Sequence, residues 1–404
     1  MPKVVGSPPS ITAPRGFRAS GVACGIKESG KPDLALIVAD HVCTAAGVFT
    51  TSRFPGEPVK VTREHLAKTG GRAQAIVCNS GISNVATGRE GYATALAMCA
   101  EVASYVGCAT EAVLVASTGV IGEPLPLDKV IHGIGAAYAA LGRGPEADEA
   151  CARAIMTTDT VPKHAFEQTG DGVRVGGIAK GAGMIAPNMA TMLGFLTTDA
   201  SASPDALREA VGVSAATTFN RLSIDSDTST SDMVLCLASS ESDRAKAPQL
   251  GEGLLAVSHG LCDQLAWDGE GVTRLIRVLI MGAADEDEAG RVARSVIDSP
   301  LVKCAVHGAD PNWGRLIMAI GKAGVPLDPA RVSVSIGVAG VVVPLIEGGQ
   351  PCELDASQRK ALEVSMSGDQ VYINIGLGRG SWEGMWTGVD LSREYVTINA
   401  DYTT

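Results

Sequence analysis

Short apolar runs alternate with segments of helical periodicity along most of this chain, and the alternation restricts the folds that it can adopt. Ala73–Cys78 has the length and composition of a strand, and Gly91–Val106 follows it with apolar residues at helical spacing. The same order recurs in four further pairs: Ala112–Ala116 with Leu127–Leu141, Met233–Leu237 with Gln249–Leu265, Leu275–Ile280 with Glu286–Ile297, and Leu301–Val306 with Trp313–Ala323. The pattern predicts sheets that are covered by helices.

The last quarter of the chain is richer in strands. The expected strands are Val332–Val338, Val341–Ile346, Val371–Gly376 and Tyr395–Asn399, with one helix near Ala356–Val364. Arg143–Ala150 has the composition of a surface linker. The predicted fold class is therefore α/β passing into α+β, with mixed sheets layered with helices.

Acidic residues outnumber basic ones, with 44 Asp and Glu against 33 Lys and Arg, for a formal net charge of −11. A nucleic-acid-binding protein neutralises phosphates with basic side chains, so this balance argues against such a partner. The longest apolar runs, such as Val341–Ile346, are far shorter than the roughly 20 residues of a membrane span. Pro8, Pro9, Pro14 and Arg15 interrupt any signal-peptide core, so we expect a cytoplasmic protein with no membrane partner.

The ten cysteines are spread singly along the sequence. No CxxC pair occurs, and no cysteine and histidine lie at the spacing of a zinc site. Most cysteines lie inside apolar runs such as Met233–Leu237, where the residue acts as a small hydrophobic side chain. We therefore expect reduced thiols in the core and no bound metal.

The most unusual segment is Gly176–Phe195, GGIAKGAGMIAPNMATMLGF. Its KGAG part lacks the spacing of a phosphate-binding loop, because Lys180 precedes the glycines. It also lacks a dinucleotide-binding fingerprint, because no GxGxxG opens a helix here. A threonine hydroxyl becomes a useful nucleophile at a chain N-terminus, because its own α-amino group then acts as the base. Thr191 would reach that state by cleavage after Ala190. The alternative is an ordinary β-branched residue that opens a strand over Met192–Leu196.

The run KGAGMIAPNMATML closely resembles the self-cleavage and active-site segment of the ornithine acetyltransferases, which are the glutamate N-acetyltransferases of the cyclic arginine pathway. Further blocks resemble the same family in the same order: STGVIG at Ser117–Gly122, MTTDTVPK at Met156–Lys163, DTSTSD at Asp227–Asp232, WDGEG at Trp267–Gly271, HGADPNWGR at His307–Arg315 and the terminal INADYTT. The resemblance implies an N-terminal-nucleophile-like, self-processing fold. It divides the sequence into an α-chain, 1–190, and a β-chain, 191–404.

The resemblance also implies roles for individual residues. Thr191, freed by cleavage after Ala190, is the expected nucleophile and carries the acetyl group as an ester. Thr118 and Gly119 match the oxyanion hole, where a hydroxyl and a backbone N–H donate to the tetrahedral oxyanion. The expected substrate-binding residues, besides Thr191, are Thr157, Thr158, Lys180, Glu270, Asn399 and Thr404.

These binding residues have plainer interpretations when the resemblance is set aside. Lys180, which resembles a ligand for a substrate carboxylate, would be a solvated charge. Glu270, which resembles a ligand for the substrate's cationic or amide end, would belong to a turn. Asn399 and Thr404 match a tail that closes over the site in the family, whereas a C-terminus commonly frays.

His307, Asp310 and Arg315 are polar residues close together in the sequence, and they suggest a charge relay. We favour a structural hydrogen-bonding loop. A threonine that supplies its own amine needs no histidine base.

The implied function is transfer of an acetyl group from N-acetylornithine to glutamate by a ping-pong mechanism, with ornithine released between the two steps. No metal or bound cofactor is needed, and acetyl-CoA is a candidate second acetyl donor. The expected assembly is an α2β2 heterotetramer.

Several alternatives stay open. They are an N-terminal-nucleophile amidohydrolase or aminopeptidase, an uncleaved paralogue that only binds an acetylated amino acid, and an acetyltransferase of secondary metabolism. Two departures from the family pattern, NSGISNVATG near Asn79 and DSDTSTSD at Asp225–Asp232, bear on the substrate range rather than on the nucleophile.

Overall fold

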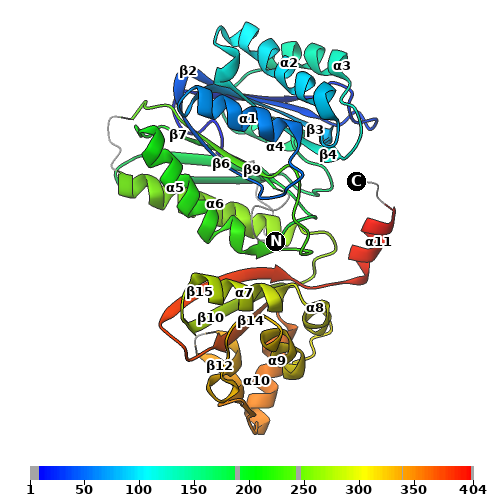
Figure 1. The fold of residues 1–404 in the computed structure, drawn as a ribbon, viewed down its shortest axis with the longest axis vertical. Helices are drawn as coiled ribbons and strands as arrows, with labels where there is room; N and C mark the ends of the chain where they lie inside the picture. The colour runs from blue at the N-terminus through cyan, green and yellow to red at the C-terminus, as the bar shows by residue number, and fades with distance from the viewer. Residues whose placement is uncertain (1–8, 187–191, 243–246, 339, 402–404) are drawn as a thin grey trace. The chain divides into compact units, whose positions relative to one another are not determined.

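The computed structural model describes residues 9–186, 192–242, 247–338 and 340–401. The chain divides into two compact units (Figure 1). Of the described residues, the first unit contains those up to Asn220 together with Asp227–Leu265, and the second contains Arg221–Ser226 and residues 266–401. The predicted boundary between 1–190 and 191–404 concerns cleavage rather than folding, and it stays a prediction.

An eight-stranded mixed sheet forms the centre of the first unit, with strand order β4-β3-β2-β9-β7-β6-β5 and with β1 paired to β2. The pairs β3/β4 and β7/β9 are parallel, and the other neighbours are antiparallel. The strands are β1 (Phe17–Val22), β2 (Leu34–Phe49), β3 (Arg72–Ile82), β4 (Val113–Val120), β5 (Lys163–Gln168), β6 (Arg174–Lys180), β7 (Leu193–Thr198) and β9 (Met233–Ala238).

Helices pack on both faces of this sheet, and β2 shows why. Leu34 and Leu36 belong to an apolar cluster with α2 and α3. Ala35 and Ile37 point the other way and belong to a cluster with α4. Successive side chains of a strand face opposite sides, so a strand that is apolar at every position is buried on both. The helices are α1 (Glu57–Lys68), α2 (Gly88–Val106), α3 (Leu127–Ala139), α4 (Pro145–Ala154), α5 (Pro204–Thr217) and α6 (Ala247–Trp267), with a short 3₁₀ helix at Thr110–Ala112.

The second unit contains a seven-stranded mixed sheet of order β13-β12-β11-β14-β10-β15-β8. Its strands are β8 (Leu222–Ser223), β10 (Leu275–Ala283), β11 (Ser333–Val338), β12 (Val341–Glu347), β13 (Gln350–Pro351), β14 (Gln370–Gly376) and β15 (Trp382–Val389). Its helices are α7 (Glu286–Ile297), α8 (Pro300–His307), α9 (Trp313–Gly321), α10 (Ala356–Ser367) and α11 (Arg393–Asp401), with a 3₁₀ turn at Pro329–Arg331. A further 3₁₀ turn, Phe219–Arg221, begins in the first unit and ends in the second. One apolar cluster joins α7, α8, α9 and α10 to β10, β11 and β14. The prediction of mixed sheets layered with helices is confirmed.

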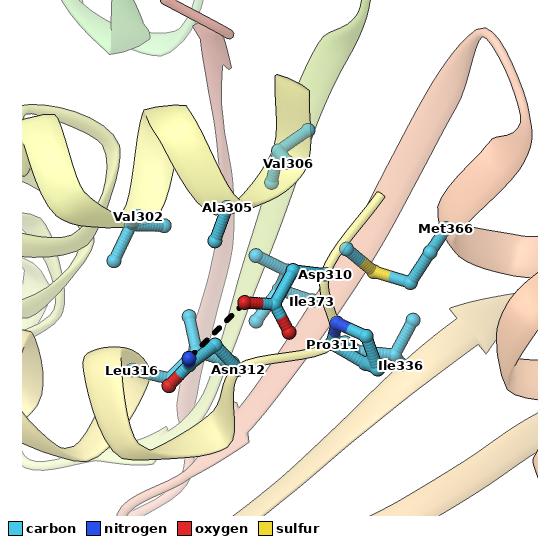
Figure 2. A pocket seen from close by; sticks show the side chains of 10 residues that line it. All are labelled: Val302, Ala305, Val306, Asp310, Pro311, Asn312, Leu316, Ile336, Met366 and Ile373. Atoms are coloured by element: carbon cyan, nitrogen blue, oxygen red, sulfur yellow. Dashed lines mark hydrogen bonds between the residues drawn. The ribbon is translucent and has the colours of Figure 1, made fainter. Parts of the chain in front are cut away.

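A small cavity lies inside this second core, between α8, α9 and the sheet (Figure 2). Apolar side chains such as Val302, Ile336 and Met366 line it, and its volume is about 10 Å³. Asn312 Nδ2 donates to Asp310 Oδ2 at 3.2 Å beside it. A space of this size holds about one water molecule. The cavity is therefore a packing feature and not a substrate site.

Three local predictions were wrong. Leu301–Val306 is not a strand but the body of α8, and Tyr395–Asn399 is not a strand but part of α11. Most of Arg143–Ala150, expected to be a surface linker, lies in α4. The strand predictions for Leu301–Val306 and Tyr395–Asn399 rested on valine and tyrosine, which are common in strands.

Helix-starting residues explain the outcome in each case. Ser299 caps α8 by accepting from the Val302 N–H, and Pro300 follows at the first helical position. Ser392 accepts from the Tyr395 N–H at the start of α11. In α4 Pro145 opens the first turn, where its fixed φ suits a helix, and inside the helix the buried carboxylate of Asp148 accepts from the N–H groups of Ser10 and Thr12.

Candidate active site

Thr118 and Gly119 lie at the carboxyl end of β4, next to the parallel strand β3. In this register Gly119 is opposite Gly81. Gly119 has a φ of +127°, and a Cβ atom there would lie 2.2 Å from the carbonyl carbon of Gly81. Only glycine therefore allows the two backbones to approach so closely at this point.

Lys180 links this end of β4 to the end of β6. Its Nζ donates to Thr118 Oγ1 at 3.2 Å, and both side chains are buried. The structure thus brings together a predicted oxyanion-hole residue and a predicted substrate-binding residue that are 62 positions apart. A hydroxyl that accepts from an ammonium group keeps its own proton free for donation elsewhere.

Thr157 and Thr158 are half-buried in the loop between α4 and β5. Asp159 holds this loop in place, because its carboxylate accepts from the Thr157 N–H at 2.9 Å and from the Gly181 N–H at 2.6 Å. The same carboxylate pairs with Lys163 Nζ at 2.6 Å, and neither side chain has exposed surface. The two threonines are therefore tied to the turn that follows Lys180.

Charge is concentrated around this turn. Burial acts to raise the pKa of Asp159, but the ammonium groups of Lys163 and Lys180 more than offset it and lower that pKa to about 2. Burial lowers the pKa of Lys180, which Asp159 opposes and Lys163 reinforces. Neither Asp159 nor Lys163 was singled out in the sequence. The available signal was their place in the MTTDTVPK block beside Thr157.

Ala190, Thr191 and Thr404 lie outside the described residues, and their roles stay predictions. The next residues along the chain, Met192 and Leu193, are described. Leu193 opens β7 directly opposite Lys180, and the Met192 N–H donates to Asp232 Oδ1 at 2.9 Å. The chain therefore enters β7 next to the strand end that carries Lys180.

Asp232 is a second carboxyl group at this end of the sheet that sequence analysis did not single out. It is fully buried, and burial raises its pKa well above the usual range, opposed by the Met192 N–H, by Lys180 and by the Ser229 hydroxyl. Its Oδ2 has no hydrogen bond of ordinary geometry within the described part of the chain. The only signal in the sequence was its position at the end of the DTSTSD block.

Glu270 and Asn399 meet in the second unit. Asn399 Nδ2, on α11, donates to Glu270 Oε2 at 2.8 Å. Two residues that the resemblance assigned to substrate binding are thus neighbours, although 129 positions separate them.

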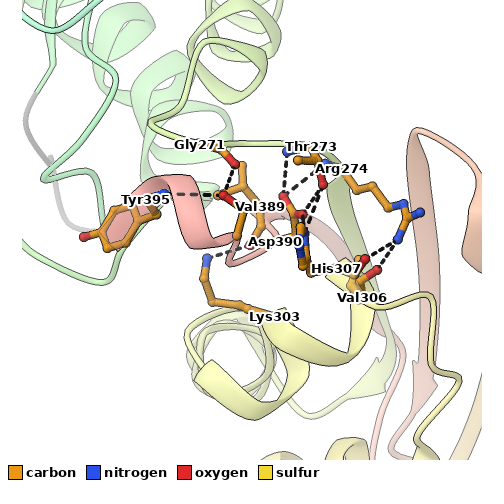
Figure 3. Close-up of polar contacts among 10 residues, drawn as sticks. Gly271, Thr273, Arg274, Lys303, Val306, His307, Val389, Asp390 and Tyr395 are labelled. Carbon is orange, nitrogen blue, oxygen red and sulfur yellow. Dashed lines mark hydrogen bonds and ion pairs between the residues drawn. The ribbon is translucent and has the colours of Figure 1, made fainter. Parts of the chain in front are cut away.

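A polar network fixes the loop that follows Glu270 (Figure 3). The buried carboxylate of Asp390 accepts from the N–H groups of Thr273 and Arg274, at 2.9 and 3.0 Å, and from the Thr273 hydroxyl. Ser392 Oγ donates to the Gly271 carbonyl at 2.6 Å. Gly271 has a φ of +69°, and a Cβ there would lie 2.4 Å from a backbone nitrogen of α11. The loop after Glu270 is therefore fastened to the start of the helix that carries Asn399.

His307, Asp310 and Arg315 each bind a different partner. His307 Nδ1 is 2.8 Å from Asp390 Oδ2 and lies in the network of Figure 3. Asp310 accepts from Asn312, and Arg315 Nη1 donates to the carbonyl of Leu301 at 2.9 Å. These contacts match a structural loop and not a charge relay among the three.

All ten cysteines are free thiols, and most are buried. Within the described ranges no cluster of histidine, cysteine, aspartate and glutamate is arranged to hold a metal ion. None of the described helices combines the length and the apolar character that crossing a membrane requires.

Comparison with known proteins gives the family. The model of the ArgJ family matches residues 18–404. The arginine biosynthesis bifunctional protein ArgJ of Thermosynechococcus vestitus is 45% identical, with 98% of each chain covered. The protein of the same name from Parasynechococcus marenigrum is 44% identical, with 98% of this chain and 95% of the relative covered. A solved ornithine acetyltransferase from Mycobacterium tuberculosis, complexed with ornithine, is 43% identical over 44% of this chain and 95% of its own, with a TM-score of 0.43. The chain therefore belongs to the ArgJ family of acyltransferases.

Proposed function

We propose that this chain is a self-cleaving N-acetyltransferase that moves an acetyl group from N-acetylornithine to glutamate through an acetyl-Thr191 ester. Cleavage between Ala190 and Thr191 would give the 1–190 and 191–404 chains. The observation that carries the proposal is the buried contact between Lys180 and Thr118, beside Gly119 and at the strand end where Met192 enters β7. Family membership supports the same reaction.

In the first half-reaction the neutral α-amine of Thr191 takes the proton of its own hydroxyl while Oγ attacks the acetyl carbonyl of N-acetylornithine. The Thr118 hydroxyl, which is free to donate, and the Gly119 N–H stabilise the oxyanion. Each such donor is worth roughly a factor of 10²–10³ in rate. The intermediate then collapses by breaking the C–N bond, and the α-ammonium gives its proton to the departing ornithine amine.

In the second half-reaction the neutral α-amine of glutamate attacks the ester carbonyl. Its excess proton passes to the Thr191 amine and then to the departing Oγ, so that N-acetylglutamate leaves and the free enzyme is restored. Neither half-reaction needs a cofactor.

The charges of the described residues suit amino-acid substrates. Lys180 has three donor hydrogens, so its ammonium can hold Thr118 and still bind a substrate carboxylate. Thr157 and Thr158 lie on the loop fastened to the turn after Lys180 and supply hydroxyls there. In the second unit, Glu270 with Asn399 is suited to the cationic or amide end of the substrate. Thr404 completes the predicted binding set.

Mass spectrometry of the purified protein tests the proposal directly. We expect two chains, one of which begins at Thr191, and an added acetyl group on that chain after incubation with N-acetylornithine alone. Thr191→Ala should abolish both. A single intact chain of 41.3 kDa, or an acetyl group on another residue, would contradict the proposal.

The choice of acceptor and donor separates the alternatives. If water removes the acetyl group as fast as glutamate does, the enzyme is an amidohydrolase. If an uncleaved chain binds N-acetylornithine without turnover, it is a binding paralogue. We propose acetyl-CoA as a second donor, and assays with each donor alone test it. Acceptors other than glutamate test a role in secondary metabolism.

We also propose that two copies of each cleaved chain form an α2β2 heterotetramer, located in the cytoplasm. Light scattering of the purified enzyme measures the mass of the assembly. Fractionation of cells that express the chain tests the location.

A further inference from the structure

One carboxylate oxygen of Asp232 has no hydrogen bond of ordinary geometry within the described part of the chain, although the Ser229 hydroxyl acts to lower the pKa of the carboxyl group. Oδ1 accepts from the Met192 N–H at 2.9 Å, whereas Oδ2 makes no hydrogen bond of ordinary geometry among the described residues. The side chain is fully buried. Burying a carboxyl oxygen without a partner is costly, so such a group calls for a ligand or a function.

The position of Asp232 indicates which group its carboxylate binds. The backbone nitrogen of Thr191 is three covalent bonds from the Met192 nitrogen and so within about 4 Å of it. We infer that the Asp232 carboxylate pairs with the α-amino group that cleavage after Ala190 creates, and thereby positions the base of acetyl transfer. This inference rests on the proposed function.

The other carboxyl group near Lys180 is already committed. Asp159 binds Lys163, the Thr157 N–H and the Gly181 N–H. Asp232 Oδ2 has capacity left, and Oδ1 contacts Met192, the second residue after the predicted cleavage position.

The electrostatic surroundings favour a neutral Asp232 before cleavage and an ionised one after it. The groups that act on Asp232 are Lys180 from β6, the Met192 N–H and the Ser229 hydroxyl. Lys180 is in turn influenced by Asp159, Lys163 and Cys78. A peptide nitrogen carries no charge, but the amine that replaces it is cationic when protonated. An adjacent cation favours the ionised carboxylate.

The pairing matters most when the amine has taken the proton of the Thr191 hydroxyl. At that moment the amine is an ammonium cation, which an ionised carboxylate attracts. A carboxylate there stabilises the ammonium until its proton passes to the departing ornithine amine. Asp232 is then a positioning residue that acts through the Thr191 amine.

Asp232→Asn tests the inference, because it keeps the oxygen that accepts from Met192 and removes the charge. Release of ornithine from N-acetylornithine is followed between pH 5 and 9. A nearby carboxylate raises the pKa of the amine, so its loss should move the acidic limb of kcat/KM to lower pH by about one unit or more. We expect kcat to fall at least about tenfold. Asp232→Glu should restore part of both.

Asp199→Asn is the matched control. Asp199 is fully buried just after the opposite end of β7, where its Oδ1 accepts from the Arg174 N–H at 2.9 Å. This variant should mature and keep the wild-type pH profile.

The outcomes separate the inference from the function. If Asp232→Asn matures with an unchanged acidic limb and kcat, the inference is wrong. It is also wrong if Asp232→Asn stays a folded, uncleaved precursor while Asp199→Asn matures, because the carboxyl group would then act before any amine exists. A wild-type protein without a chain that begins at Thr191 would instead overturn the proposed function.

Discussion

At the residue scale, two residues show what the described part of the site requires. One must leave room for a neighbouring backbone, and the other must hold a buried negative charge. Gly119 is where β3 and β4 approach too closely for a side chain. Asp159 is where a buried carboxylate holds two backbone N–H groups and a buried lysine. Each requirement can be tested by one substitution.

Gly119→Ala should lower the free energy of unfolding by at least about 2 kcal/mol, because its Cβ would meet the backbone at Gly81 and its φ is positive. Gly122→Ala is the control: Gly122 also has a positive φ, +86°, but no atom lies within 4 Å of its Cβ position. The control should lose only about 1 kcal/mol. Urea unfolding measures both, and equal losses would show that steric contact at Gly119 is unimportant.

Asp159→Asn should destabilise the protein by about 3–5 kcal/mol at neutral pH, because it breaks the fully buried ion pair with Lys163. The pKa of Asp159 is lowered from 3.8 to about 2 in the folded protein. The ion pair therefore contributes its full stability above about pH 4, and this is lost as the pH falls through about 2.

Unfolding of wild type and Asp159→Asn at pH values from 7 to 2 measures this difference, which should shrink below pH 4. Asp205→Asn, which breaks an exposed pair with Arg208, should change little at any pH. A difference between wild type and Asp159→Asn that stays constant down to pH 2 would contradict the account.

At the element scale, caps and register decide what periodicity leaves open. The apolar pattern predicted α7 with its observed bounds, Glu286–Ile297, and the strands β11, β12 and β14. It failed for α8 and α11, where valine and tyrosine suggested strands and where Ser299 and Ser392 start helices. Propensity is a weak local preference that capping and packing override.

The start of α11 leads to a prediction about substrate binding. Asp390→Asn weakens the hydrogen bonds that hold Thr273 and Arg274, and so loosens the loop that carries Glu270. We expect KM for N-acetylornithine to rise about five- to tenfold, which corresponds to roughly one hydrogen bond, with a smaller effect on kcat. Steady-state kinetics measures the changes in KM and in kcat separately. Glu383→Gln, at an exposed position on β15, should leave KM unchanged, and an equal KM for both variants would contradict this role.

At the scale of the whole molecule, the predicted cleavage position lies in the connection between two paired strands. β6 precedes it and β7 follows it, and the two are antiparallel neighbours from Val175–Thr198 to Lys180–Leu193. β9, also after the cleavage position, pairs with β2. The first unit therefore mixes strands from both predicted chains in one sheet.

The cleaved chains should consequently stay together in the absence of denaturant. We expect two bands on a denaturing gel but a single peak in size-exclusion chromatography that contains both chains. Thr191→Ala, which should not be cleaved, provides the reference elution volume. Separation of the two chains in native buffer would contradict the observed strand order.

The sequence by itself determined the layered α/β architecture, because apolar periodicity is a local property of each segment. It also pointed to Thr118, Gly119, Lys180, Glu270 and Asn399, through blocks that resemble a known family. Only the tertiary structure decided that Lys180 contacts Thr118, that Asn399 contacts Glu270, and that Met192 contacts Asp232. The partners in these contacts are 62, 129 and 40 positions apart, and strand register and loop anchoring bring them together. The low pKa of Asp159 and the raised pKa of Asp232 were likewise hidden in the sequence, since burial and neighbouring charges exist only in the folded chain.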